Sequence, residues 1–206
     1  MEVKICGLTN IEDARCAIDA GADYLGFVLY QKSPRSVSPE KLAEIVGSLG
    51  DDVRAVGVFV NETPTEVKRV MRECGLYAAQ IHGDESSGDF SGLSFPVWRA
   101  VWIENENPIP DPKSWGADRY VIDAAVPGQY GGSGITADWD VSARLVRKFP
   151  VMLAGGLTAE NVRSAVEIVQ PLGVDVSSGV ECEPGHKDHD AVRTFVAEAK
   201  SKDLRA

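Results

Sequence analysis

The chain has 206 residues, of which 44% are hydrophobic, and it carries a formal net charge of −10 at pH 7. A chain of this length and apolar content buries one substantial core, so we expect a single domain over residues 1–206. The acidic balance argues against a nucleic-acid partner and against an anionic membrane surface, because both would require a basic face on the protein.

Short apolar runs rich in β-branched residues recur from end to end of the chain, and each predicts a buried strand. Most runs are continuously apolar rather than alternating, which is typical of parallel strands that are covered on both faces. In chain order, the eight predicted strands are residues 3–6, 24–28, 55–59, 78–81, 97–103, 120–122, 151–154 and 174–176.

Signals for helix starts and helix ends lie between many of these strands. Two of the starts read as capping boxes, in which a hydroxyl residue precedes a glutamate by three positions. The predicted N-caps are Thr9, Ser38, Thr63 and Thr158. The glycines predicted to end a helix are Gly21, Gly75 and Gly173.

Eight strands with helices between most of them predict an α/β fold, a single closed (β/α)8 TIM barrel, rather than an open doubly wound sheet. Glycines and prolines interrupt the stretches that follow the fourth and fifth strands. These residues are Gly88, Gly92, Pro108, Pro110 and Pro112. We therefore expect short or irregular helices after strands 4 and 5.

The four cysteines form no CxxC pair and no framework of disulfides. They are Cys6, Cys16, Cys74 and Cys182. The N-terminus opens directly on a predicted strand and lacks the charged and apolar regions of a signal peptide, and no apolar run is long enough to span a bilayer. We expect a cytoplasmic protein without a membrane partner.

The active site of such a barrel lies at the carboxyl ends of its strands, and several reactive side chains fall there. Cys6 ends the first predicted strand, His82 follows the fourth and Asp123 follows the sixth. Arg35 lies in the loop after the second strand. The turns after the last three strands contain Gly132, Gly134, Gly155, Gly156, Ser178 and Gly179. Because these ends meet at one rim, we expect the residues to form one site.

Each of these residues also has a structural interpretation. A lone cysteine at a strand end, such as Cys6, usually packs as a small buried hydrophobe. Asp123 suits a turn or a helix N-cap, and Arg35 suits a solvated loop charge. The glycine pairs suit tight turns, although the loops after the last two strands are also the usual phosphate site of these barrels.

A metal site is an alternative for the segment near residue 185, because Cys182, His186 and His189 lie within eight residues of one another. A second set of ligands is missing from the rest of the sequence. We therefore expect no metal and no cofactor, and interpret the segment as a polar loop in which Asp188 caps the last helix.

Seven sequence blocks from residue 3 to about residue 188 carry a family resemblance. They are KICGLT at 4–9, GFV at 26–28 followed by SPR at 33–35, VFVN at 58–61, QIHG at 80–83, YGGSG at 130–134, LAGGL at 153–157 and GVDVSSGVE at 173–181. In order and spacing, the chain resembles the phosphoribosylanthranilate isomerase family. The resemblance implies an Amadori rearrangement of N-(5-phosphoribosyl)anthranilate to 1-(2-carboxyphenylamino)-1-deoxyribulose 5-phosphate in tryptophan biosynthesis.

The resemblance also implies roles for the rim residues. Asp123 is the general acid at the ring oxygen, and Cys6 is the general base at the sugar C2. Arg35 pairs with the anthranilate carboxylate, and His82 lies on the ligand-facing rim. The glycine-rich turns bind the phosphate through backbone N–H groups. The two-residue period of a strand puts Lys4 on the same face as Cys6, so we interpret Lys4 as an electrostatic neighbour.

Other functions remain as alternatives. The related histidine-pathway sugar isomerase and its dual-substrate form use an aspartate on the first strand, where this chain has Cys6. A phosphate-binding barrel without catalysis is a further alternative, and the presence of both Cys6 and Asp123 disfavours it. The expected partner is a small molecule with a phosphate and an anthranilate carboxylate; the sequence predicts no oligomeric state.

Overall fold

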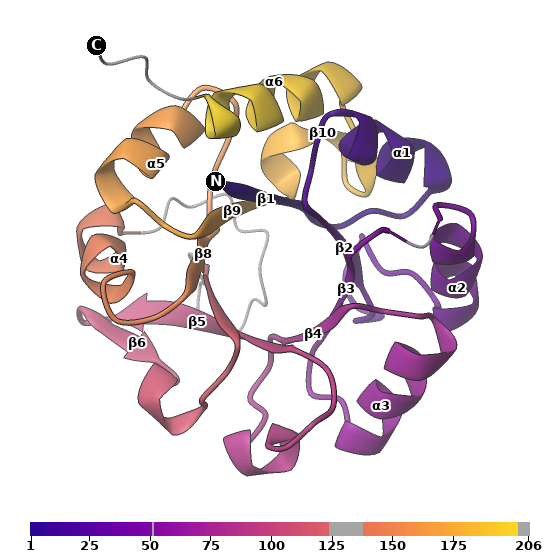
Figure 1. Ribbon diagram of the computed structural model, residues 1–206, viewed down its shortest axis with the longest axis horizontal. Coiled ribbons are helices and arrows are strands. Elements are labelled where there is room, and N and C mark those ends of the chain that lie inside the picture. The colour runs from indigo at the N-terminus through magenta and orange to yellow at the C-terminus, as the bar shows by residue number, and fades with distance from the viewer. Residues whose placement is uncertain (51, 124–137, 202–206) are drawn as a thin grey trace.

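Eight parallel strands close into a barrel in the computed structural model, which describes residues 1–50, 52–123 and 138–201 (Figure 1). The strands are β1 (Glu2–Ile5), β2 (Tyr24–Val28), β3 (Ala55–Phe59), β4 (Ala78–Ile81), β5 (Val97–Glu104), β7 (Arg119–Ile122), β8 (Val151–Leu153) and β9 (Gly173–Val176). They follow one another around the ring in chain order, and the pairing of β9 with β1 closes it. The predicted (β/α)8 barrel is confirmed, and every predicted strand agrees with an observed strand to within one residue at each end.

Helices surround the barrel on its outer face (Figure 1). They are α1 (Ile11–Asp19), α2 (Pro39–Gly47), α3 (Pro64–Glu73), α4 (Trp139–Leu145), α5 (Val162–Val169) and α6 (His189–Lys200). After β4 there is only a short 3-10 helix, η1 (Ser87–Phe90). After β5 come β6 (Asn107–Ile109), which is antiparallel to β5, and the 3-10 helix η2 (Pro112–Ser114). The expected irregular connections after strands 4 and 5 are confirmed.

A buried arginine organises the region that lacks a full helix. The Arg99 guanidinium donates to the carbonyls of Ile81 and Gly83 at 3.2 and 2.5 Å and pairs with Glu85 at 3.1 Å. The central carbon of the Arg99 guanidinium lies 4.4 Å from the centroid of the Trp115 ring. These contacts hold the loop after β4 against the barrel wall and therefore help to fix the residue that follows β4.

Two of the predicted N-caps are confirmed. The Ser38 hydroxyl accepts from the Lys41 N–H at 3.2 Å, and the Thr63 hydroxyl accepts from the Glu66 N–H at 3.2 Å. Each helix then begins at a proline, whose missing N–H costs nothing in the first turn. Of the predicted terminating glycines, Gly21 and Gly75 have the positive φ values of 91° and 62° that such a position requires.

The predicted cap at Thr9 is wrong by one residue. Asn10 caps α1 by accepting from the Asp13 N–H at 2.8 Å, because the Thr9 hydroxyl instead donates to the carbonyl of Gly185 at 2.6 Å. Thr9 thus ties the first loop to a segment near the C-terminus, a contact that local spacing does not predict.

The predicted boundaries of α5 are also wrong. The helix begins at Val162, and Thr158 donates its backbone N–H to the Asn161 carboxamide at 2.9 Å instead of capping the helix. The helix ends at Gln170, which adopts a φ of 53°, so Gly173 is free to serve as the first residue of β9.

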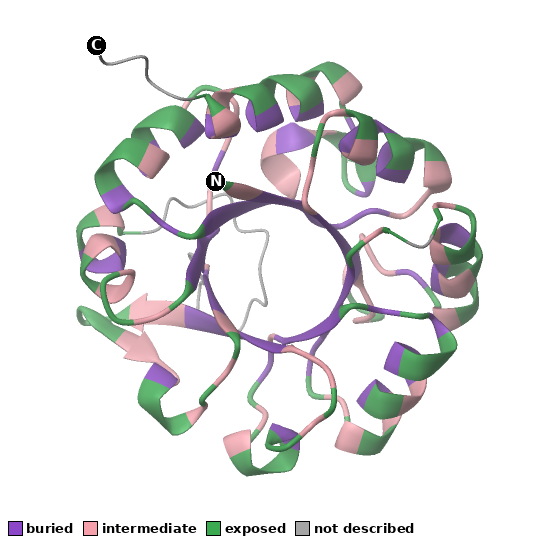
Figure 2. Cartoon of the chain, in the orientation of Figure 1, coloured by how far each residue is buried: buried purple, intermediate pink, exposed green. Residues whose placement is uncertain are grey.

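The barrel strands are coloured as buried almost throughout, and the helices carry buried and exposed residues in turn (Figure 2). A small apolar cluster in the barrel interior is separate from the larger core between strands and helices. Its members are Tyr24, Val56, Ala78, Trp98, Val121, Met152 and Ala154. The Tyr24 and Trp98 rings meet edge to face, with centroids 4.9 Å apart. Because side chains alternate along a strand, the residues two positions after these face the barrel interior as well, nearer the carboxyl rim. In the part of the chain that the structure describes, no helix is long and apolar enough to cross a membrane.

Candidate active site

Cys6 directly follows β1, and its backbone N–H donates to the Val176 carbonyl at 2.8 Å. Val3 and Ile5 belong to the outer core, so Lys4 and Cys6 point to the opposite, interior side of the barrel. Only 9% of Cys6 is exposed, and Lys4 is fully buried. The predicted placement of both residues on one face is confirmed.

A glycine on the neighbouring strand makes room for these two side chains. A Cβ added at Gly26 would lie 2.7 Å from the Cys6 sulfur and 2.9 Å from Lys4 Cε. Both distances are shorter than van der Waals contact, so any side chain at position 26 would displace Cys6 or Lys4. The absence of a side chain on β2 is therefore part of the construction of the site.

Lys4 has a buried counter-ion that the sequence did not reveal. Its Nζ lies 2.9 Å from Oδ2 of Asp175, and the two residues are direct partners in the β1–β9 pairing. Burial by itself would lower the pKa of Lys4, but Asp175 and Cys6 outweigh it and the pKa is raised, so Lys4 is a cation. The register of β1 against β9 was the signal needed to find Asp175.

Burial raises the pKa of the Cys6 thiol above its ordinary value, and it is the largest influence on that group. Lys4 opposes burial by lowering the pKa, and Lys187 does so more weakly, whereas Asp175 adds to the increase. The cationic neighbour expected for Cys6 is therefore present, although burial has the larger effect on the Cys6 pKa.

His82 and Asp123 approach each other across the end of β5. His82 follows β4, Asp123 follows β7, and His82 Nε2 lies 3.5 Å from Asp123 Oδ2. The other ring nitrogen, Nδ1, lies 2.9 Å from the Gln80 carboxamide nitrogen. The amide donates in this arrangement, so Nδ1 is the acceptor and Nε2 carries the proton that faces Asp123. Both side chains are mostly buried but remain in part accessible, at 12% and 13%.

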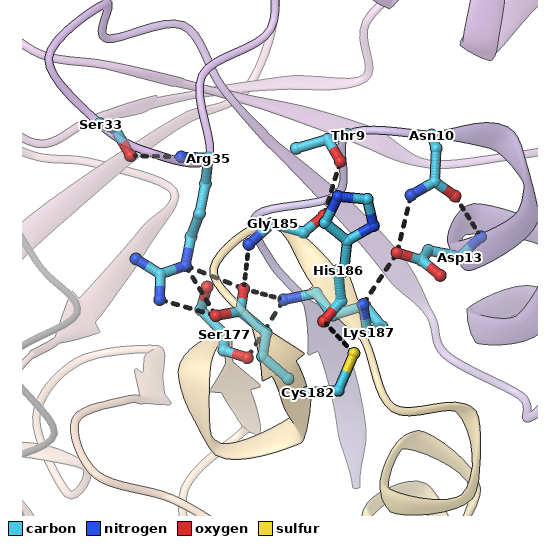
Figure 3. A network of polar contacts seen from close by, with 11 residues as sticks. Thr9, Asn10, Asp13, Ser33, Arg35, Ser177, Cys182, Gly185, His186 and Lys187 are labelled. Carbon is cyan, nitrogen blue, oxygen red and sulfur yellow. Dashed lines mark hydrogen bonds and ion pairs between the residues drawn. The ribbon is translucent and has the colours of Figure 1, made fainter.

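Arg35 is held in a bidentate ion pair and is not a solvated loop charge (Figure 3). Its Nε and Nη2 donate to Glu181 Oε1 and Oε2 at 2.8 and 2.7 Å. Lys187 Nζ donates to the same Oε1 at 2.8 Å and to the Ser177 carbonyl at 3.1 Å. Glu181 and Lys187 were not predicted, because they come from a segment that the sequence indicated to be a polar loop.

That segment is a two-stranded hairpin, so the prediction of a loop was wrong. Strands β10 (Glu181–Glu183) and β11 (His186–Lys187) pair in antiparallel fashion. The short strands turn Glu181 and Lys187 toward Arg35. The hairpin follows η3 (Ser178–Val180), and the Lys187 N–H donates to Asp13 of α1 at 2.9 Å, which fastens the hairpin to the first helix.

The turns after β8 and β9 pack against each other. Gly155 and Gly156 have φ values of 80° and 61°, in the left-handed region that favours glycine. A Cβ added at Gly179 would lie 1.9 Å from the Leu157 carbonyl oxygen, so the second turn requires glycine for close approach to the first. Ser178 begins η3 beside Gly179. Gly132 and Gly134, the other predicted phosphate residues, lie outside the described residues.

The residues considered for a metal take other partners. His189 Nε2 lies 2.8 Å from Asp13 Oδ1, and the Cys182 sulfur contacts the His186 carbonyl at 3.5 Å. Within residues 1–50, 52–123 and 138–201, no group of three possible ligands is arranged to hold a metal ion. Asp188 caps α6 as predicted, accepting from the N–H groups of Asp190 and Ala191.

The arrangement combines a thiol, a carboxylate with an imidazole beside it, a fixed guanidinium and glycine turns on one rim. Such a set suits proton transfers on a small anionic substrate.

Known proteins share both the sequence and the barrel. A family model described as N-(5'phosphoribosyl)anthranilate (PRA) isomerase matches residues 3–198. The N-(5'-phosphoribosyl)anthranilate isomerase of Pelobacter propionicus is 43% identical over 200 residues, which cover 97% of this chain and 96% of that protein. The phosphoribosyl anthranilate isomerase of Thermus thermophilus superposes with a TM-score of 0.87 at 36% identity, over 96% of this chain and 98% of that chain. A phosphoribosyl anthranilate isomerase in complex with reduced 1-(o-carboxyphenylamino)-1-deoxyribulose 5-phosphate superposes with a TM-score of 0.82 at 38% identity, over 97% of this chain and 98% of that chain.

Proposed function

The chain belongs to the N-(5'-phosphoribosyl)anthranilate isomerase family, and on this premise we propose how its own residues carry the isomerisation. The reaction converts an aminosugar phosphate to an aminoketose in tryptophan biosynthesis. One acid and one base are required, together with sites for a carboxylate and a phosphate.

The observation that carries the proposal is the placement of Cys6 and Asp123. Each follows a barrel strand directly, and the two strands, β1 and β7, are separated by β8 and β9 in the ring. The two side chains therefore stand on well separated parts of one rim, and a sugar between them can be approached from two sides. This separation favours a mechanism in which Cys6 and Asp123 each transfer a different proton, and not one in which they share a proton.

Asp123 donates its proton to the ring oxygen as the bond from that oxygen to C1 breaks. The lone pair of the anilino nitrogen moves into the C1–N bond and leaves a Schiff base. Cys6, as thiolate, then removes the proton from C2; the electron pair of that bond forms a C1–C2 double bond, and the C1–N π electrons return to nitrogen to give an enolamine. Loss of the C2 hydroxyl proton and protonation of C1 complete the aminoketose, so no atom or electron is gained from outside.

We assign the anthranilate carboxylate to Arg35. Glu181 takes the Nε and Nη2 side of the guanidinium and leaves Nη1 and the second Nη2 proton as an end-on fork. Glu181 is itself anchored by Lys187, which supports a fixed orientation of Arg35 before substrate arrives. The fork then binds the carboxylate without first having to be ordered.

The phosphate is assigned to the turns after β8 and β9. The support is the left-handed pair Gly155 and Gly156, a backbone conformation in which successive N–H groups can face an anion, and the close packing of Gly179 on the Leu157 carbonyl. Ser178 adds a hydroxyl at the same place, and the proposal also assigns the phosphate to Gly132 and Gly134, which follow β7 in the sequence and lie outside the described residues. His82 is assigned to the acid side of the site, beside Asp123.

We further propose that residues 1–206 act as one cytoplasmic domain. One sheet takes strands from both ends of the chain, which supports a single domain, and the four cysteines are free thiols, which supports a reducing compartment.

Turnover of phosphoribosylanthranilate, followed as the loss of its fluorescence, tests the proposal. The Cys6→Ser and Asp123→Asn variants should each lose about 10²–10⁴ in rate relative to the parent protein. The Cys74→Ser variant is the matched control, because Cys74 is a buried thiol of the outer core. Parent activity should survive exhaustive chelation, and loss that one metal ion restores would contradict a metal-free mechanism. A parent protein that binds phosphate without turnover would identify the non-catalytic alternative.

A further inference from the structure

An ion pair is buried inside the barrel directly beneath the proposed base. Lys4 is fully buried and its Nζ lies 2.9 Å from Asp175, and an apolar cluster that includes Tyr24 and Trp98 fills the neighbouring interior. Taking two charges out of water costs several kcal/mol per ion, and apolar residues of similar volume are often as stabilising or more so. The pair is therefore poorly explained by stability, and a functional role must be sought in what it touches.

The nearest reactive group to the pair is the Cys6 thiol. A Cβ added at Gly26 would meet both the Cys6 sulfur, at 2.7 Å, and Lys4 Cε, at 2.9 Å, so the two atoms flank one point in space. Strand β2 has a glycine at position 26, and the methylene chain of Lys4 and the Cys6 sulfur occupy the space that a side chain at this position would take. The fold thus places the Lys4 side chain beside the Cys6 thiol, and a glycine in β2 is the condition for this contact.

Charged groups reach Cys6 from four segments of the chain. Lys4 lies on β1, Asp175 on β9, Lys187 on β11 and Arg35 in the loop after β2, and each interacts electrostatically with the thiol. Glu181 neutralises part of this charge through its bonds to Arg35 and Lys187. Among the described residues, this cluster holds three basic side chains and two carboxylates, so its charge favours the thiolate of Cys6 and opposes the effect of burial on the Cys6 pKa.

We propose that Lys4 is a positioning residue for Cys6: its ammonium, fixed by Asp175, holds the Cys6 thiolate in the form that removes the substrate proton. The inference rests on the proposed role of Cys6 as base. Lys4 itself lies below the sulfur and does not need to touch the substrate.

The proposal predicts opposite effects on the Cys6 pKa for the loss of Lys4 and for the loss of Asp175. This distinguishes it from a purely structural role of the ion pair. Lys4 lowers the pKa of Cys6, whereas Asp175 raises it. Removing either partner of a purely structural pair would disturb packing in the same direction. Removing them one at a time should instead move the titration of Cys6 in opposite directions.

The test is the pH dependence of Cys6 alkylation by iodoacetamide, measured by mass spectrometry of the peptide that contains Cys6, from about pH 7 to pH 11.5. All variants carry Cys182→Ser, because Cys182 is exposed and would react first. In Lys4→Met the midpoint should rise by about one pH unit or more, which makes alkylation about tenfold slower below the midpoint. In Asp175→Asn the midpoint should fall. The control is Lys41→Met, which removes an exposed lysine of α2 and should leave the midpoint unchanged.

Midpoints that do not move, or that move in the same direction in both variants, would overturn the proposal. If Lys4→Met does not fold, as a thermal melt would reveal, Asp175→Asn decides by itself: a lower midpoint supports the coupling and an equal or higher one overturns it. The pH profile of kcat/KM should follow the alkylation midpoint. If the midpoints move as expected while Cys6→Ser keeps full turnover, the coupling stands and the role of Cys6 as base is the part that fails.

Discussion

His82 Nε2 lies 3.5 Å from Asp123 Oδ2, so an imidazole that follows β4 lies beside the proposed acid, which follows β7. Gln80, on the strand that leads to His82, bonds the opposite ring nitrogen at 2.9 Å and fixes the orientation of the imidazole. In the proposed mechanism, His82 therefore assists the acid Asp123 as well as lining the rim.

His82→Ala should lower kcat by about 10- to 100-fold, the scale of one lost hydrogen bond to a charged group. Product binding should change much less, because neither the carboxylate site nor the phosphate site is altered. Gln80→Leu should have a smaller effect in the same direction, since it frees the ring without removing it. Steady-state kinetics together with product titration decide. Equal losses in kcat and in product affinity would mean that His82 is a binding residue instead.

Cys6 and Asp123 should be distinguishable by the isotope effect of deuterium at the sugar C2. In Cys6→Ser, proton abstraction becomes limiting, so a primary isotope effect should emerge or grow. In Asp123→Asn, ring opening should limit and the effect should stay small. The measurement is turnover of labelled and unlabelled substrate by each variant. An isotope effect unmasked only by the loss of Asp123 would show that the two roles are reversed.

Arg35→Ala should weaken transition-state binding by about 1.5–3 kcal/mol, the usual scale for a charged hydrogen bond. An analogue without the carboxylate should then lose little further, because the group it lacks no longer has a partner. Glu181→Gln is the matched variant: it keeps the shape of the anchor and loses its charge, so it should raise KM by loosening Arg35. If Arg35→Ala and the parent discriminate equally against the analogue, Arg35 does not bind the carboxylate.

Asp13 should make stability depend on pH. Burial alone would raise the pKa of Asp13, but bonds from the Lys187 N–H, His189 and Asn10 lower it below the ordinary value. Because the folded pKa is depressed, this stabilisation is present above the unfolded pKa and is lost as pH falls through the folded value. Asp13→Asn should therefore cost about 1–3 kcal/mol at pH 7 and much less in acid.

The measurement for Asp13 is the free energy of unfolding by urea at neutral pH and in acid. Asp19→Asn is the control, because Asp19 is an exposed acid of the same helix. A cost for Asp13→Asn that is equal at both pH values would show that packing, not charge, is responsible.

Gly179→Ala should destabilise the protein and weaken phosphate binding together. The added methyl would meet the Leu157 carbonyl oxygen at 1.9 Å, so the turns after β8 and β9 must separate. Gly47→Ala is the control, since its added methyl meets nothing within 4 Å and the residue lies at the end of α2. Thermal melts and titration with inorganic phosphate provide the two readouts. A Gly179→Ala variant with unchanged phosphate affinity would remove this turn from the phosphate site.

The strands were predictable because parallel strands buried on both faces leave continuous apolar runs, and those runs ended within one residue of the observed limits. The caps at Ser38 and Thr63 were predictable because a cap is a contact over three residues. Thr9 was assigned wrongly because a residue far along the chain, Gly185, competes for its hydroxyl.

The partners of the site residues could not be predicted in the same way. Asp175 is 171 positions from Lys4 and Glu181 is 146 positions from Arg35, so only the closed ring brings them together. The hairpin that holds Glu181 and Lys187 has strands of three and two residues, too short to leave a periodic pattern. Sequence therefore predicted candidate reactive groups, and the fold was needed to identify the side chains that contact them.

The pairing of β1 with β9 also bears on synthesis of the chain. Lys4 leaves the ribosome well before its counter-ion Asp175, which follows 171 positions later in the chain. A nascent chain that closed β1 into an apolar interior before β9 emerged would bury an uncompensated ammonium, at a cost of several kcal/mol. The first strand must therefore stay hydrated until the final strand arrives, and a chain cut short before residue 175 has no means of completing the barrel around its own N-terminus.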